Sequence, residues 1–170
     1  MNLHHTTLND LPFLCEIEQR FAKLGFVHSD NLCTHQHQMN DPDYAYYTVE
    51  QGEGFVGYVI LRGLSSINHS LELKRIVIAD PGKGLGRQVL LAVIDRAFGE
   101  FRANRLWLDV YEDNHRARHV YRSLGFVEET TSANSPKNGR CHRALVIMSI
   151  SKAALKISSN RILLVREETA

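Results

Sequence analysis

A short apolar strand, a glycine-rich turn and an amphipathic helix follow one another in residues 76–94, IVIADPGKGLGRQVLLAVI. The first turn of a helix leaves about four backbone N–H groups without an intrahelical acceptor, and the helix dipole is positive there. Glycine lets a ligand approach such a backbone closely, because no Cβ intervenes. The stretch therefore predicts a phosphate-binding turn, with a plain tight connection as the alternative. The residues that suggest this role are the glycines Gly82, Gly84 and Gly86 and the cations Lys83 and Arg87.

The sequence of this turn does not match two widespread phosphate-binding motifs. The nucleotide P-loop requires G-x-x-x-x-G-K-[ST], whereas here Gly84 follows Lys83. The dinucleotide motif G-x-G-x-x-G would need glycine at the position of Arg87 or of Val89. A protein that uses this turn for ATP or for a nicotinamide dinucleotide is therefore disfavoured.

The composition is that of one globular domain of 170 residues, with 44% hydrophobic residues, 23% charged residues and a net charge of +1. The weak charge gives no reason to expect nucleic acid as a partner. An apolar run of about 18 residues and a secretory signal pattern are both lacking, so no membrane partner is expected. The scattered cysteines Cys15, Cys33 and Cys141 favour a reducing, cytoplasmic location.

Hydrophobic periodicity predicts an α/β fold, with helices packed on a mixed sheet. Asp10 stands where it would cap the first helix, and Gly125 stands where the last helix would end. Residues 1–150 are expected to form one domain, and residues 151–170 to add an edge strand, contact a partner subunit or be disordered. Strands are expected at 2–8, 44–50, 55–63, 71–79, 105–111, 126–131 and 143–150, and helices at 11–21, within 28–43, at 84–101 and at 114–124.

A second motif lies in residues 106–129, LWLDVYEDNHRARHVYRSLGFVEE, where a strand leads through Asn114 to a helix carrying Tyr121 and then to a Gly-Phe pair. Together the two motifs resemble the acetyl-CoA-binding core of the GNAT superfamily of N-acetyltransferases. That family has a [QR]-x-x-G-x-[GA] loop and an N-x-x-A-x-x-x-Y-x-x-x-G-F helix. The resemblance covers residues 71–129, with a consistent order of elements over 2–150. Pro81 departs from the family's Gln or Arg at the loop start.

The resemblance implies a GNAT-like acyl-CoA N-acyltransferase fold. Its central sheet would be mostly antiparallel, with about seven strands, splayed in the middle and flanked by about four helices. The implied reaction moves an acetyl group from acetyl-CoA to a primary amine of a small molecule or of a peptide or protein N-terminus. Direct attack in a ternary complex is expected, with no metal and no cysteine nucleophile, and a homodimer is compatible with the family. The alternative is a catalytically silent, CoA-binding regulatory module.

The resemblance also implies a set of cofactor-binding residues. Backbone N–H groups of the turn would hold the pyrophosphate, and the preceding strand would expose its backbone to the pantetheine arm. Asn114 would hydrogen-bond to the pantetheine, unless it is only a helix N-cap, and Arg116 or Arg118 could approach the phosphates. The set comprises Ile76, Val77, Ile78, Lys83, Gly84, Leu85, Gly86, Arg87, Gln88, Asn114, Ala117 and Tyr121.

Three side chains are candidates for the proton transfers. By resemblance, Tyr121 would protonate the departing CoA thiolate, its alternative being an ordinary core tyrosine. The acceptor arrives as an ammonium and must lose a proton before it can attack. Glu72 and Asp109 are the candidate bases, with a slight preference for Glu72 because glutamate reaches farther. Bulk water is a third possibility, in which case both carboxylates are solvated charges on the sheet.

The identity of the acceptor is the least constrained property. Residues 20–45 and the loop 132–140 are expected to form the acceptor pocket, where His28, His35 or Tyr46 would touch the substrate. The segment CTHQHQ lacks the ligand spacing of a zinc site, so a polar surface is the preferred interpretation. The polar, His-rich lining favours a small polar amine.

Overall fold

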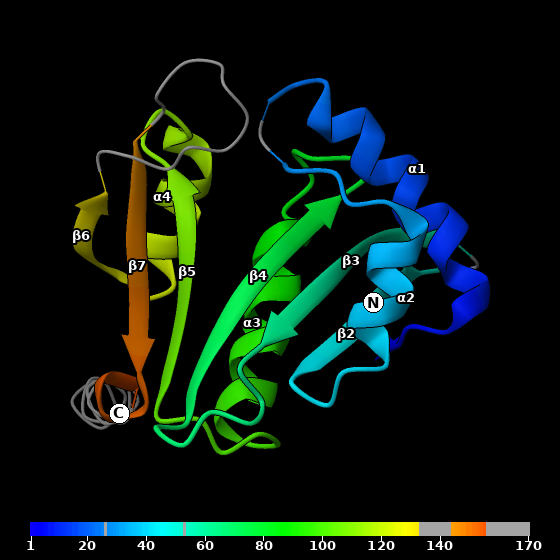
Figure 1. Ribbon diagram of the computed structural model, residues 1–170. Helices are drawn as coiled ribbons and strands as arrows, with labels where there is room; N and C mark the ends of the chain where they lie inside the picture. Colours follow the sequence, from blue (N-terminus) through cyan, green and yellow to red (C-terminus); the bar gives the residue numbers. More distant parts are fainter. Residues whose placement is uncertain (26, 53, 133–143, 156–170) are drawn as a thin grey trace, which may run out of the picture.

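The structure, a computed structural model, describes residues 1–25, 27–52, 54–132 and 144–155 (Figure 1). Seven strands form one sheet in the order β1-β2-β3-β4-β5-β7-β6, and every pairing except the parallel pair β4–β5 is antiparallel. The predicted mixed sheet is therefore confirmed. The strands are β1 (Asn2–His5), β2 (Tyr44–Gln51), β3 (Gly54–Arg62), β4 (Ser70–Ile78), β5 (Arg105–Tyr111), β6 (Val127–Ser132) and β7 (Leu145–Ser151). The helices are α1 (Leu11–Ala22), α2 (Leu32–Met39), α3 (Leu85–Phe98) and α4 (His115–Ser123), with a short 3-10 helix η1 (Leu8–Asp10).

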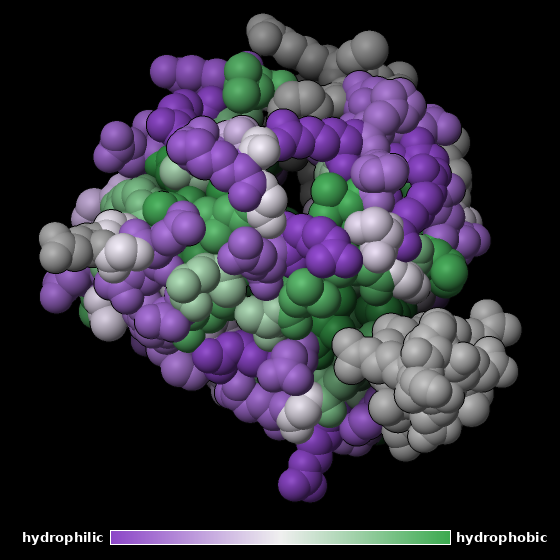
Figure 2. Space-filling model, turned by 180° about the vertical axis from the view of Figure 1, so that it is seen from behind, coloured by the Kyte–Doolittle hydropathy of each residue, from purple (hydrophilic) through white to green (hydrophobic). Residues whose placement is uncertain are grey.

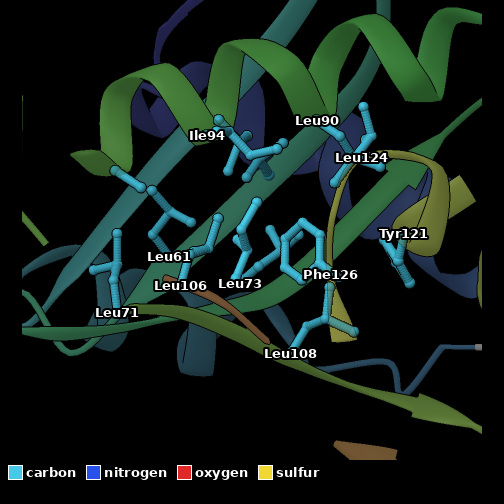
Figure 3. Packing of buried hydrophobic residues seen from close by; sticks show 14 of the residues in the cluster. Leu61, Leu71, Leu73, Leu90, Ile94, Leu106, Leu108, Tyr121, Leu124 and Phe126 are labelled. Carbon is cyan, nitrogen blue, oxygen red and sulfur yellow. The ribbon is translucent and has the colours of Figure 1, made fainter. Parts of the chain in front are cut away.

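Helices cover both faces of the sheet, and each face has its own hydrophobic cluster (Figure 1). The larger cluster packs α3 and α4 on the sheet. In it Leu90 and Ile94 of α3 point toward the strands, and Phe126 fills the centre (Figure 3). The smaller cluster packs the apolar face of α1 against Tyr58 and Ile60 of β3. The periodic apolar residues of each helix thus meet the alternating residues of one sheet face.

The facing of side chains changes in the middle of β4. Leu71 and Leu73 belong to the α3-side cluster and so does Ile76, whereas Val77 belongs to the α1-side cluster. Because side chains of a regular strand alternate, this change needs one extra residue. The pairing with β3 shifts at this place, where Leu61 pairs with Leu73 and the preceding Ile60 pairs with Arg75. A β-bulge at Lys74 therefore separates two regular halves of β4.

Strands β4 and β5 touch only at one end. Their parallel pairing is confined to residues 70–72 with residues 105–107. Beyond Glu72, β4 continues along β3 and β5 continues along β7, so the two strands diverge (Figure 1). The splayed sheet implied by the family resemblance is present.

Most predicted boundaries lie within one or two residues of the observed ones, but two differ by three residues. The first strand ends at His5, because the carboxylate of Asp10 accepts hydrogen bonds from the backbone N–H of Thr7 at 2.7 Å and from its hydroxyl at 2.9 Å. That contact accompanies the extra turn η1. Asp10 is the N-cap residue of α1 as predicted, but its side chain bonds to Thr7 and makes no cap hydrogen bond to α1. Helix α3 ends at Phe98, three residues before the predicted 101, with Gly99 as its C-cap.

Gly125 ends α4 as predicted. Its φ of 93° lies in the left-handed region, which glycine adopts without a Cβ clash. The N–H of Phe126 donates to the carbonyl of Tyr121 at 3.1 Å, which closes the helix end in the manner of a Schellman turn.

The first residues of the C-terminal extension are folded against the domain. Strand β7 runs through Ser151, and the backbone N–H of Lys152 donates to the carbonyl of Asn104 at 3.0 Å. Leu155 packs against the larger cluster. The remaining predictions for this extension, an edge strand, a subunit contact or disorder, concern residues 156–170, which lie outside the described part of the chain.

A buried polar network joins α1 and α2 to the sheet, with Glu18 at its centre. The Glu18 carboxylate accepts hydrogen bonds from the Tyr58 hydroxyl at 2.5 Å, from His35 Nε2 at 3.2 Å, from the backbone N–H of Asp30 at 2.9 Å and from the Arg75 guanidinium. Burial opposes its charge, but the His35 hydrogen bond, the Arg75 charge and the Tyr58 hydroxyl together hold the pKa of Glu18 below its usual value. The network is therefore a charged, fully hydrogen-bonded part of the α1-side core.

Replacement of Glu18 by alanine is expected to lower the free energy of unfolding by about 3–5 kcal/mol, because Arg75 would stay buried with one of its carboxylates gone. Urea unfolding measures the change, and Glu16→Ala on the exposed face of α1 is the matched control, with an effect within about 0.5 kcal/mol. Since the pKa of Glu18 is lowered in the folded state, its contribution is present above the unfolded value of about 4.3 and is lost as pH falls below it. Equal effects of the two substitutions at pH 7 would contradict this role.

Candidate active site

A cleft of about 650 Å³ opens where β4 and β5 separate. Its lining comes from the free halves of both strands, the glycine turn, the first turn of α3, one face of α4, and the end of α1 with the residues that follow it. Seen from the α3 side, a hollow rimmed by hydrophilic residues lies in the upper half of the molecule (Figure 2). The cleft thus has one wall from each side of the sheet.

The glycine turn adopts a conformation that requires glycine. Gly82 and Gly84 have φ of 117° and 75°, in the left-handed region, and Gly84 is the N-cap of α3. The N–H groups of Arg87 and Gln88 both donate to the carbonyl of Gly84, at 3.1 and 3.3 Å. The N–H groups of Leu85, the first helical residue, and of its neighbour Gly86 precede the first intrahelical bond and are free for an anion.

Cations flank this turn. Arg87 of α3 and Arg116 of α4 line the cleft, and Arg116 Nη2 would lie 3.7 Å from a Cβ on Gly82. Lys83 points elsewhere, since it is 77% exposed and pairs with Asp80 at 2.6 Å. Arg118 is likewise used in the structure, because it donates to Glu128 at 2.9 and 3.0 Å. Of the four predicted cations, Arg87 and Arg116 are therefore the two that face the site.

The predicted cofactor-binding residues divide into two groups. Leu85 is buried in the larger cluster, and the side chains of Lys83 and Gln88 are exposed outside the cleft lining. The others line the cleft: Ile76, Val77, Ile78, Gly84, Gly86, Arg87, Asn114, Ala117 and Tyr121.

Asn114 is the N-cap of α4 and also lines the cleft, so its two predicted roles do not exclude each other. Its Oδ1 accepts from the backbone N–H of Ala117 at 3.1 Å, which makes it the N-cap of α4. It also lines the cleft, where its side-chain amide nitrogen carries two donors that the cap does not use.

Tyr121 lies at the edge of the larger cluster, where α4 meets the cleft (Figure 3). It is 8% exposed, and its ring centroid is 5.8 Å from that of Phe126. Burial, and then the nearby charge of Asp109, raise the pKa of Tyr121 to about 12. The phenol is therefore protonated at neutral pH and can only act as a proton donor or hydrogen-bond partner there.

The two candidate bases have different surroundings. Glu72 is 8% exposed, forms an ion pair with Arg62 and stands in the last pair of residues that joins β4 to β5, behind the cleft lining. Burial raises its pKa, against the opposing charge of Arg62. Asp109 is exposed, lines the cleft and acts electrostatically on Tyr121. Its position in the cleft favours Asp109 as the general base. The longer side chain of Glu72 is the only reason to prefer that residue.

One end of the cleft is lined by the end of α1 and the residues after it; it is called the acceptor end after its predicted role. Phe21, Leu24 and Val27 supply an apolar wall, and His28 lines the cleft beside them. His35 and Tyr46 are not in this lining. They belong to the buried network, where His35 Nδ1 and the Tyr46 hydroxyl are joined by a hydrogen bond of 3.1 Å. Most of the loop 132–140, the other predicted part of the pocket, lies outside the described residues.

The described cysteines lie away from the lining of the cleft. Cys15 and Cys33 do not line it, and Cys141 lies outside the described residues. In the described ranges, no three or more His, Cys, Asp or Glu residues gather as they would around a metal ion. None of the helices described is long and apolar enough to cross a membrane.

Two cations of the cleft were not foreseen. Lys74 and Arg75 stand at the bulge of β4 and both line the acceptor end. The sequence does carry a signal for them, because the apolar positions of this strand change from Leu71 and Leu73 to Ile76 and Ile78. Apolar residues thus switch from odd-numbered to even-numbered positions within one strand, which indicates one inserted residue.

Comparisons with known proteins agree on the family. Residues 11–126 match the model of the acetyltransferase (GNAT) family. A spermidine N(1)-acetyltransferase of Vibrio cholerae serotype O1 is 31% identical over 85 residues, which are 49% of this chain and 49% of that relative. The aligned region thus spans about half the length of this curated relative.

Solved structures of spermidine N-acetyltransferase from Vibrio cholerae have a similar fold. One, in complex with CoA and spermine, has a TM-score of 0.79 and 23% identity, covering 90% of this chain and 96% of that one. Another, described as dodecameric, has a TM-score of 0.76 and 22% identity, covering 89% and 94%. The family model spans both sequence motifs and more than half of the chain, which confirms the resemblance: the chain belongs to the acetyltransferase (GNAT) family.

Proposed function

We propose that this protein transfers the acetyl group of acetyl-CoA to a primary amine by direct attack in a ternary complex. The observation that carries the proposal is the presence of a protonated tyrosine, Tyr121, and a carboxylate, Asp109, in one cleft that also contains the glycine turn. Membership of the GNAT family supports the reaction, and the names of the relatives support an amine as acceptor.

The free edge of β4 suits the pantetheine arm of the cofactor. Once β4 has left β5, the backbone groups that would bond to a neighbouring strand at residues 76–78 face the cleft. An amide-containing chain can pair with such an edge as an extra strand would. The pyrophosphate would then meet the N–H groups of Leu85 and Gly86 with Arg87 and Arg116, and Asn114 would donate to a pantetheine carbonyl.

Asp109 and Tyr121 divide the proton transfers. Asp109 accepts a proton from the acceptor ammonium, which frees the nitrogen lone pair to attack the thioester carbonyl. When the tetrahedral intermediate collapses, the C–S bond breaks, and the Tyr121 hydroxyl gives its proton to the leaving thiolate. The excess proton on the amide nitrogen then passes to the Tyr121 phenolate and restores the phenol. A catalytically silent CoA-binding module, the rival function, would have no use for an acid and a base in the same cleft.

Self-association and cellular location remain predictions for this chain. One relative is described as dodecameric, which supports an oligomer, a homodimer being the simplest case. The expected cytoplasmic location rests on the sequence composition and on the scattered cysteines.

Calorimetric titration with acetyl-CoA, with ATP and NAD as controls, tests the proposed cofactor. Binding of acetyl-CoA alone is expected, followed by release of CoA thiol when amines are added. Gly86→Val should weaken acetyl-CoA binding more than tenfold without lowering the melting temperature, because the new Cβ would lie 3.8 Å from Ile78 Cγ1 and valine forms helix better than glycine. Leu91→Ala, exposed on the same helix, is the control. Equal binding of ATP, or full affinity in Gly86→Val, would contradict the proposed cofactor site.

Tyr121→Phe keeps the ring in the core and removes only the hydroxyl group. Its turnover is expected to fall about 100-fold, in the range of a lost general acid. Affinity for acetyl-CoA should change less than twofold by titration. Because the pKa of Tyr121 is about 12, the wild-type rate should show no basic limb from this group below about pH 10. Unchanged turnover would remove Tyr121 from the acid role.

Asp109→Asn and Glu72→Gln separate the two candidate bases by the pH dependence of kcat/KM. A base works only when deprotonated, so the rate should rise with pH through its pKa. Asp109→Asn is expected to abolish this acidic limb, and Glu72→Gln to retain it. The reverse pattern would assign the base to Glu72, whose raised pKa would place the limb above the usual range of a carboxyl group.

A further inference from the structure

The charged groups at the acceptor end of the cleft are mostly neutralised by one another. Arg75 pairs with Glu18 and, at 3.0 Å, with Asp30. Glu72 pairs with Arg62, and His28 lies 3.6 Å from Asp30. These groups have little charge left for a ligand.

Two charged groups of the acceptor end stand outside these pairs. Within the described ranges, no carboxylate lies within ion-pair distance of Lys74, and no cation lies within that distance of Asp109. Both residues belong to the lining of the cleft. In the described part of the chain, the cleft lining therefore includes a cation and a carboxylate that are not engaged in ion pairs.

Lys74 is held in an environment that favours an anionic partner. The bulge of β4 presents it to the cleft, and its ammonium lies 5.9 Å from the centroid of the Tyr44 ring. It is partly buried, and burial together with the charge of Arg62 lowers its pKa. An acidic group from a ligand would relieve both the desolvation and the repulsion from the neighbouring guanidinium groups.

Resting on the proposed function, we propose that the acceptor is an amine that also carries an acidic group, as an amino acid does. Lys74 binds the acidic group, and Asp109 receives the ammonium. Lys74 is then the residue that determines acceptor specificity.

The same charges disfavour a polyamine, although the relatives are named for spermidine. A polyamine brings several positive charges and needs several carboxylates around it. Among the described residues, the cleft lining has one carboxylate, Asp109, and the unpaired cation Lys74 would repel the further ammonium groups of a polyamine.

Matched acceptors test this proposal. Each of a panel of L-amino acids is compared with its carboxamide and its aminophosphonate analogue, alongside spermidine, by kcat/KM at saturating acetyl-CoA. The wild type is expected to prefer the carboxylate to the carboxamide by about tenfold, the effect of one charge-assisted contact. The phosphonate arm shows whether the site takes a planar carboxylate or any acidic group.

Substitutions at Lys74 assign the preference to this residue. Lys74→Met keeps the side-chain length and is expected to bring the carboxylate-to-carboxamide ratio to about one. Lys74→Glu should reverse the ratio and raise the rate with spermidine. Lys23→Met, an exposed lysine outside the cleft lining, is the control and should leave the ratio unchanged.

Each outcome is informative when acetyl-CoA binding is titrated in parallel. Three results overturn the proposal while the proposed function stands: spermidine or carboxamides used as well as carboxylates, an unchanged ratio in Lys74→Met, or acetyl-CoA binding with no acid-bearing amine acetylated. Absence of acetyl-CoA binding defeats the proposed function itself, and the acceptor proposal falls with it.

Discussion

Strand β4 has two neighbours but bonds to both over only three residues. It follows β3 along its whole length and leaves β5 after Glu72. A strand in the middle of a sheet normally satisfies its backbone groups on both edges. Here the upper half of β4 keeps one edge open, and the cleft, the glycine turn and the candidate acid and base are all arranged around that edge.

The bulge at Lys74 gives the two halves of β4 different tasks. Below it, Leu71 and Leu73 build the core under α3, and Glu72 stays behind the cleft. Above it, Arg75 reaches Glu18 on α1, which ties the free half of the strand to the opposite helix layer. A half-free strand would otherwise have few contacts to fix it, so the buried network compensates for the missing strand partner.

Much of the fold could be predicted, because its signals are local. Apolar periodicity located the strands and helices, and the two motifs located the cleft walls. The relative placement of Glu72 and Asp109 could not be predicted, since it depends on where β4 leaves β5. Glu18 contacts His35, Tyr58 and Arg75, which are 17, 40 and 57 positions away in the sequence. No pattern in a single sequence predicts contacts over such separations.

The two hydrophobic clusters meet only through the sheet, and this separation has an evolutionary consequence. The α3 and α4 layer carries the glycine turn and Tyr121, whereas the end of α1 and the residues after it line the acceptor end. Substitutions that reshape one layer leave the packing of the other nearly intact, because distant sites are energetically additive. Under the proposed function, a descendant of this chain can therefore change its acceptor in small, individually viable steps, while the half proposed to hold acetyl-CoA is inherited unaltered.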